Sequence, residues 1–118
     1  MIDNNQDFMD SRDIIARLEE LEEGETDEVL DIYEKEELDI LRKINEEGER
    51  SSNWKYSITL IRDSYFEEYA QEYAIEIGAI SDDMSWPSNY IDWEQAAEEL
   101  QTDYILIDFD GVEYWARG

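Results

Sequence analysis

The sequence contains no cysteine and no histidine. The absence of cysteine excludes disulfide bonds and thiol nucleophiles, and it fits a reducing cytosol. Without histidine, no serine has an imidazole base to activate it, and the chain also lacks a nucleophile elbow and a glycine-rich phosphate loop. We therefore expect a non-enzymatic protein with no catalytic residues.

Basic residues are scarce, and long apolar runs are missing. Nine lysines and arginines stand against 34 acidic residues, which gives a formal net charge of −25. No apolar segment approaches the ~18 residues of a membrane span, and the acidic start MIDNNQDFMD does not read as a signal peptide. Because membranes and nucleic acids are themselves anionic, we expect a cytoplasmic protein that binds neither directly and has a basic protein as its partner.

The composition nevertheless predicts a folded chain. Of the 118 residues, 42% are hydrophobic and 13% aromatic, which is enough for one domain with a modest core and is unlike disordered segments. Residues 1–50 hold 19 acids and 6 bases (net −13), and residues 51–118 hold 15 acids and 3 bases (net −12). The charge is therefore a property of the whole folded body, and it far exceeds the net charge of about 2 to 8 that solubility requires.

Hydrophobic periodicity predicts an α+β fold with about four helices packed on a small antiparallel sheet and a C-terminal β-hairpin. Residues 1–9 are expected to form a flexible tail, followed by a single acidic domain over 10–118. Its first part, 10–48, is a predicted helical hairpin in which Gly24 ends the first helix and Thr26 or Asp27 begins the second. The first helix has its apolar positions at Ile14, Ile15, Leu18 and Leu21, and the buried side of the second is expected to hold Leu30, Tyr33, Leu38, Leu41 and Ile44. Val29 belongs to the same apolar row in the sequence.

The second part of the domain is expected over residues 54–118. Its local signals are, in chain order, a strand-like alternation (54–61), a capping box (Ser64 with Glu67), a helix-ending Gly78, a second capping box (Asp92 with Gln95) and an Asp110-Gly111 turn. Aspartate followed by glycine between two β-rich runs favours a type I′ hairpin, which needs positive φ at both central residues.

The carboxylates are the main candidate binding groups. Acids three or four positions apart on a helix lie roughly 5 to 6 Å apart along its axis, and two or three such faces together approach the charge density of duplex DNA. The first predicted acidic surface comprises Glu19, Glu20, Glu22, Glu23, Asp27, Asp31, Glu34, Glu37, Asp39, Glu46 and Glu47. The second comprises Glu67, Glu68, Glu72 and Glu76, followed by Glu94, Glu98 and Glu99. A loop adds Asp82 and Asp83 beside two aromatic anchors, Trp86 and Tyr90.

These surfaces favour a DNA-mimic inhibitor that occupies the nucleic-acid groove of a basic host protein or complex. The alternative is an antitoxin-like or adaptor module that docks on a basic partner through Trp86, Tyr90 and the helical hairpin. An enzyme with paired carboxylates ranks last, since it would need a cleft with two buried acids. The segment DFDGVE lacks most of a calcium loop, so we expect no metal and no cofactor. The long helix predicted over 27–47 also has the length to pair with a second copy.

Three stretches together resemble a known family: SRDIIARLEELEE, LIRDSYFEEYAQEYAIEIGAI and WPSNYIDWEQAAEELQTDYILIDFDGVEYWARG. They are similar to small acidic proteins encoded by bacteriophages, prophages and mobile elements, some of which are labelled antirestriction-like. The segment from Trp86 through Trp115 carries the most specific part of the likeness. The resemblance implies a bacterial or phage cytoplasmic setting and a role against host defence. Under the DNA-mimic hypothesis, the target is a restriction–modification complex or a CRISPR effector. It implies no catalytic motif.

Overall fold

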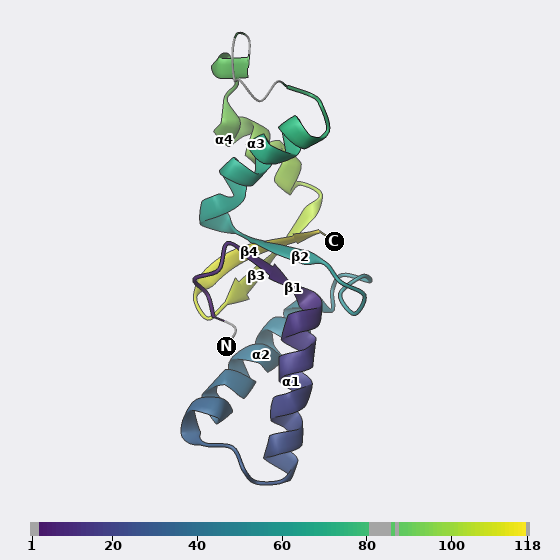
Figure 1. Ribbon diagram of the computed structural model, residues 1–118, viewed down its shortest axis with the longest axis vertical. Coiled ribbons are helices and arrows are strands. Elements are labelled where there is room, and N and C mark those ends of the chain that lie inside the picture. The colour runs from purple at the N-terminus through teal and green to yellow at the C-terminus, as the bar shows by residue number, and fades with distance from the viewer. Residues whose placement is uncertain (1–2, 81–85, 87, 118) are drawn as a thin grey trace.

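The computed structural model is a rod with principal extents of 60 × 25 × 19 Å, and it describes residues 3–80, 86 and 88–117. A four-stranded sheet lies across the middle of the rod, and a pair of helices extends from each side of it (Figure 1). The α+β prediction, with its four α-helices and C-terminal hairpin, is confirmed. Among the described residues, no helix combines the length and hydropathy that crossing a bilayer requires.

The elements follow one another along the chain as β1 (Phe8–Asp10), α1 (Ser11–Thr26), α2 (Ile32–Gly48), β2 (Thr59–Arg62), a 3-10 turn (Asp63–Tyr65), α3 (Phe66–Glu76), a second 3-10 turn (Ser88–Tyr90), α4 (Trp93–Gln101), β3 (Tyr104–Phe109) and β4 (Val112–Arg117). The strand order is β1-β2-β4-β3, and every neighbouring pair is antiparallel. Alternate residues of each strand face opposite sides of the sheet. Leu60 and Tyr114 therefore contact the α1/α2 pair, whereas Ile61 and Trp115 contact α3/α4.

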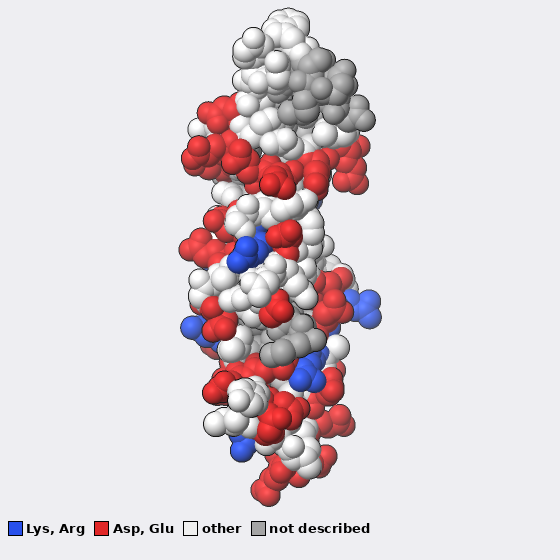
Figure 2. All heavy atoms as spheres, turned by 60° about the vertical axis from the view of Figure 1, so that its left-hand side comes forward, with Lys and Arg blue, Asp and Glu red and all other residues white. Residues whose placement is uncertain are grey.

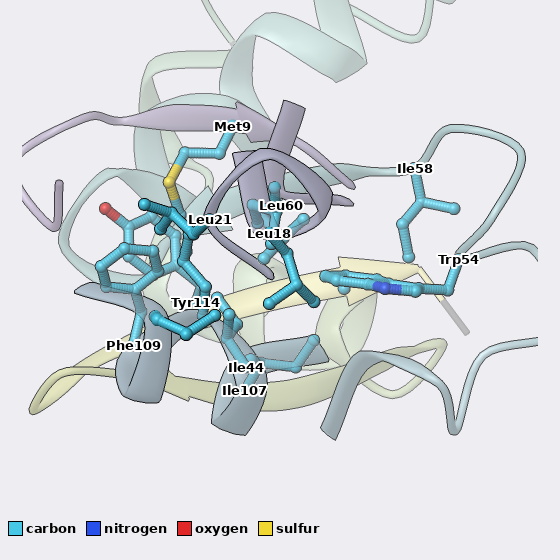
Figure 3. Packing of buried hydrophobic residues seen from close by; sticks show 14 residues of the cluster. Met9, Leu18, Leu21, Ile44, Trp54, Ile58, Leu60, Ile107, Phe109 and Tyr114 are labelled. Atoms are coloured by element: carbon cyan, nitrogen blue, oxygen red, sulfur yellow. The ribbon is translucent and has the colours of Figure 1, made fainter. Parts of the chain in front are cut away.

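The larger core lies between the sheet and the α1/α2 pair. It contains fourteen buried side chains, which converge from both helices and the sheet in Figure 3. The buried Trp54 indole donates from Nε1 to Asn45 Oδ1 at 2.7 Å. A Cβ at Gly48 would lie 2.4 Å from that ring, so only glycine lets α2 approach the indole this closely. The Tyr114 hydroxyl donates to the Gln6 carbonyl at 2.6 Å, which satisfies its polar atom.

The smaller core joins α3 and α4 to the opposite face of the sheet. Phe66 is its centre, with edge-on ring contacts to Tyr69, Tyr104 and Trp115 at centroid distances of 5.4, 5.3 and 6.0 Å. Ala70 on α3 and Ala97 on α4 are both buried in this cluster, and their small side chains allow the two helices to pack closely.

The predicted tail and the first predicted strand are corrected by the structure. Residues 8 and 9, expected in the flexible tail, belong to β1, which pairs with β2 and buries Met9. Three residues are too few to show a strand periodicity in the sequence. The strand expected over 54–61 begins only at Thr59, because the chain turns at Ser57 (φ 131°) after Trp54 has entered the core. Buried Ser11 fixes this turn, since its hydroxyl donates to the Trp54 carbonyl at 2.7 Å.

The expected helix boundaries are also revised. Gly24 does not end α1, which continues to Thr26, and α2 begins at Ile32 rather than near residue 27. Asp31 is the N-cap of α2, instead of Thr26 or Asp27, because it forms a complete capping box with Glu34.

At the start of α3, the predicted capping box is wrong. Residues 63–65 form a 3-10 turn, and no side chain caps the helix that follows.

Two further local predictions are confirmed, the first of them in part. Asp92 caps α4 by accepting the Gln95 backbone amide, which is the N-cap half of the predicted capping box. The Asp110-Gly111 turn has the two positive φ angles (47° and 88°) that a type I′ hairpin needs.

Candidate protein-binding surface

On the α1/α2 pair, arginines neutralise several of the predicted binding acids. Arg17 contacts Glu37 at 2.7 Å and Glu20 at 3.2 Å, and Arg42 contacts Glu25 at 2.8 Å and Glu22 at 3.5 Å. The hydrogen bond to Glu37 raises the pKa of the Arg17 guanidinium above its usual value, so that the guanidinium stays charged. The prediction for Glu37 is wrong: this side chain is only 7% exposed, and it lies under Arg17 instead of on the surface.

Other predicted binding acids on α1 and α2 have roles within the fold. Asp31 and Glu34 cap α2, as described above. The Glu47 carboxylate accepts the Asp108 amide at 3.3 Å, and Arg50 donates to the Leu106 carbonyl at 2.7 Å. Both contacts cover the outer edge of β3, which blocks pairing of this edge strand with another chain. The predicted acids that remain exposed without such a role are Glu19, Glu23, Asp27, Asp39 and Glu46.

The α3/α4 pair presents its acids differently. Seven glutamates are exposed there, and we call them the acidic belt: Glu67, Glu68, Glu72, Glu76, Glu94, Glu98 and Glu99. Figure 2 shows a band of acidic side chains around this end of the rod. The sequence has no lysine or arginine between Arg62 and Arg117. Among the described residues, all ion pairs lie on α1 and α2. The belt is therefore an array of carboxylates without neighbouring cations on its own helices.

Helix geometry gives the belt a regular spacing. Glu68, Glu72 and Glu76 stand four residues apart on α3, which places them along one side of the helix at steps of about 6 Å. The Tyr65 hydroxyl donates to Glu72 at 2.7 Å, and this hydrogen bond is the main cause that raises the pKa of Tyr65 to about 12. The phenol thus stays neutral and holds one carboxylate of the row in place.

The segment between α3 and α4 lies at the end of the rod beyond the belt (Figure 1). The two predicted aromatic anchors lie here, with Trp86 77% and Tyr90 76% exposed, and the Ile77 side chain is exposed as well. The other two predicted loop residues, Asp82 and Asp83, lie outside the described residues.

Two features of the surface were missed by the sequence reasoning. Counting charges by halves gave nearly equal values and hid the base-free stretch between Arg62 and Arg117, which a running count of lysine and arginine would have revealed. The second feature is the exposure of Val29, Ile32 and Tyr33, which helical periodicity alone could not detect. Within the part of the chain that the structure describes, no three acidic side chains converge to hold a metal ion.

Comparisons with protein-family models, with curated protein sequences and with solved structures found no match for this chain.

Proposed function

We propose that this protein is a non-enzymatic inhibitor that imitates DNA and occupies the nucleic-acid groove of a basic protein. The acidic belt carries the proposal, because it offers seven exposed carboxylates on two packed helices with no basic residue between Arg62 and Arg117. The resemblance to acidic phage proteins favours a host defence enzyme as the target, either a restriction–modification complex or a CRISPR effector. Lysines and arginines that meet phosphates in such a groove would meet the belt instead.

The overall charge density supports the same proposal. A net charge of −25 along a 60 Å axis is about one negative charge per 2.4 Å, against one per about 1.7 Å in duplex DNA. A 60 Å length of duplex carries about 35 phosphates, and the net charge of the chain is −25. The protein therefore approaches the linear charge of the ligand that it would replace.

Rigidity is the second requirement for mimicry. A disordered acidic tail would lose conformational entropy when it binds, whereas the belt acids stand on helices that are already packed. The aromatic core around Phe66 holds α3 and α4 to the sheet and so fixes the belt relative to the rod.

The test begins with capture of partners from a bacterial lysate at about 50 mM salt, where surface charges are weakly screened. Captured nucleic-acid-binding proteins are then tested for displacement of the protein by duplex DNA. We expect competitive displacement, and we expect the affinity to fall by at least about 100-fold between 50 and 200 mM salt. A complex that duplex DNA does not displace and whose affinity does not change with salt would refute the mimicry.

A pair of charge-matched variants locates the contact. The belt variant changes Glu67, Glu68, Glu72 and Glu76 to glutamine, and the control variant changes Glu19, Glu23, Glu36 and Glu46 to glutamine. Both remove four exposed negative charges, so they alter the net charge equally. We expect the belt variant to lose at least about 30-fold in affinity and the control variant only a few-fold, since distant charges are screened.

The exposure of Trp86 and Tyr90 favours a second candidate function, docking of an adaptor on a basic partner. Such docking depends on a few aromatic anchors, whose truncation each costs about 2 kcal/mol or more. The double substitution W86A/Y90A separates the two functions. Mimicry predicts a small loss of affinity, whereas aromatic docking predicts a loss of at least about 100-fold.

A further inference from the structure

The turn between α1 and α2 exposes three large apolar side chains. The sequence pattern did not predict this exposure. Val29 is 71%, Ile32 68% and Tyr33 75% exposed. We call these three residues the α1–α2 knob. The knob lies at the end of the helical hairpin, which extends away from the sheet on the side opposite the acidic belt (Figure 1).

The knob is held in this orientation by its own turn. Leu30 is half-buried against Gly24, where an added Cβ would lie only 2.5 Å from Leu30 Cδ2. The Val29 amide donates to the Gly24 carbonyl at 3.0 Å, and Glu28 takes a left-handed φ of 58°. Leu30 packs inward on this backbone, while Val29 beside it is exposed, and Ile32 and Tyr33 are exposed in the first turn of α2. The exposure is therefore built into the fold.

A groove of about 170 Å³ runs beside Tyr33 toward the β3–β4 turn. Its apolar lining residues are Ile40, Leu41 and Phe109, and its exposed acidic lining residues are Asp3, Glu36 and Asp110, because the buried Glu37 carboxylate already binds Arg17. Long basic side chains place an apolar stem along such an apolar lining while the charged head reaches the acidic residues. The groove therefore suits the side chain of one lysine or arginine.

We propose that the α1–α2 knob docks a basic amphipathic segment of a partner protein, with apolar side chains on Val29, Ile32 and Tyr33 and one cationic side chain in the groove. Charge complementarity selects this occupant. Residues 19–39 carry twelve acids and one base, Lys35. A second copy of the chain or an anionic membrane would bring like charge to the same place. This proposal stands independently of the acidic belt.

The probe for the test is a fluorescein-labelled amphipathic helix of about 18 residues, with leucine at i, i+3, i+4 and i+7 and lysine elsewhere. Fluorescence anisotropy at about 150 mM salt measures its binding to the full chain, so that distant charges are screened. The knob variant V29S/I32S/Y33S should weaken binding at least about tenfold. The belt variant (Glu67, Glu68, Glu72 and Glu76 to glutamine) is the control and should change binding less than about threefold.

Hydrogen exchange of the complex reports where the probe lies. We expect protection over residues 27–40 and a much weaker signal with a probe in which serine replaces leucine. Circular dichroism checks the fold of the knob variant, and Y33S alone serves as a second variant with an expected loss of a few-fold. Equal binding of the probe by the wild type and the knob variant would overturn the proposal. A wild type that is dimeric and a knob variant that is monomeric would also overturn it.

Failure here is distinguishable from failure of DNA mimicry. The knob variant should leave the displacement by duplex DNA unchanged, whereas the belt variant should alter it.

Discussion

The acidic side chains of the two helical pairs that flank the sheet have different surroundings. On α1 and α2, Arg17 and Arg42 form four ion pairs, and other acids cap a helix or cover a strand edge. On α3 and α4, seven exposed glutamates stand in a stretch without any basic residue. The first pair also covers a core of fourteen buried side chains, whereas the second rests on a cluster of four.

This difference separates charge that is compensated inside the fold from charge that the fold leaves uncompensated. An acid with a local cation or backbone donor has its charge largely compensated inside the protein. A row of acids without such partners repels itself and destabilises the helices that carry it. The α3/α4 pair carries this repulsion although its core is small. This arrangement is expected if a basic partner neutralises the belt on binding.

The largest expected effect concerns the smaller core. Replacing Phe66 by alanine removes a buried ring and its three aromatic contacts, which should cost about 3 to 5 kcal/mol in the free energy of unfolding of this region. Native-state hydrogen exchange should show α3 and α4 losing protection while α1 and α2 retain most of theirs. Equal losses at both ends would mean that the rod unfolds as one unit and that the two regions are not energetically distinct.

The next effect tests the Arg17–Glu37 ion pair of the other region, in which Glu37 is buried and Arg17 is partly exposed. Arg17→Met leaves the buried Glu37 without its cation, and we expect a loss of about 3 kcal/mol in denaturant-induced unfolding. The double variant R17M/E37M should recover most of the stability, since a buried pair can be exchanged for apolar side chains. By contrast, Glu68→Gln in the belt should leave stability unchanged or slightly raised. A destabilisation by E68Q equal to that of R17M would contradict the assigned roles.

Salt should act unequally on the two helical pairs. Raising the salt concentration from about 50 to 500 mM screens exposed repulsion, so α3 and α4 should gain about 0.5 to 1 kcal/mol of protection. The α1/α2 pair should gain less, because its screened repulsion is offset by weakened ion pairs. Hydrogen exchange at both salt concentrations measures this, and the comparison fails if α1 and α2 gain more.

The smallest effect is a titration. The hydrogen bond to Glu72 raises the pKa of Tyr65 to about 12 from 10, so its contribution to stability is complete below pH 10 and is lost as the pH rises through 12. Glu72→Gln removes the carboxylate and should bring the Tyr65 pKa back toward 10. NMR of tyrosine labelled at the ring carbon bearing the hydroxyl follows this one residue. An unchanged pKa in E72Q would show that Glu72 is not the cause.

The same comparison explains what the sequence could and could not predict. Strong local signals were correct, including the Asp110-Gly111 hairpin and the Asp92 cap, because each depends on a few adjacent residues. β1 was missed because three residues carry no periodicity, and its place depends on pairing with the distant β2. Glu37 was placed on the surface because its burial depends on Arg17, which lies twenty residues away on another helix.

The candidate surface was predicted in part. The belt acids follow from helical spacing, and their exposure agrees with it. The neutralisation of acids on α1 and α2 could not be foreseen, since ion pairs between helices depend on their packing. The exposed Val29 and Tyr33 also escaped the pattern, because the position of the turn is set by the Asp31–Glu34 capping box and by Leu30 on Gly24.

The footprint of the captured partner on this chain tests the central claim most directly. Hydrogen exchange of the complex at low salt should show protection concentrated on α3 and α4, and duplex DNA should remove it. Protection confined to the segment around Trp86 and Tyr90, or to the ion-paired faces of α1 and α2, with no response to DNA, would contradict the account.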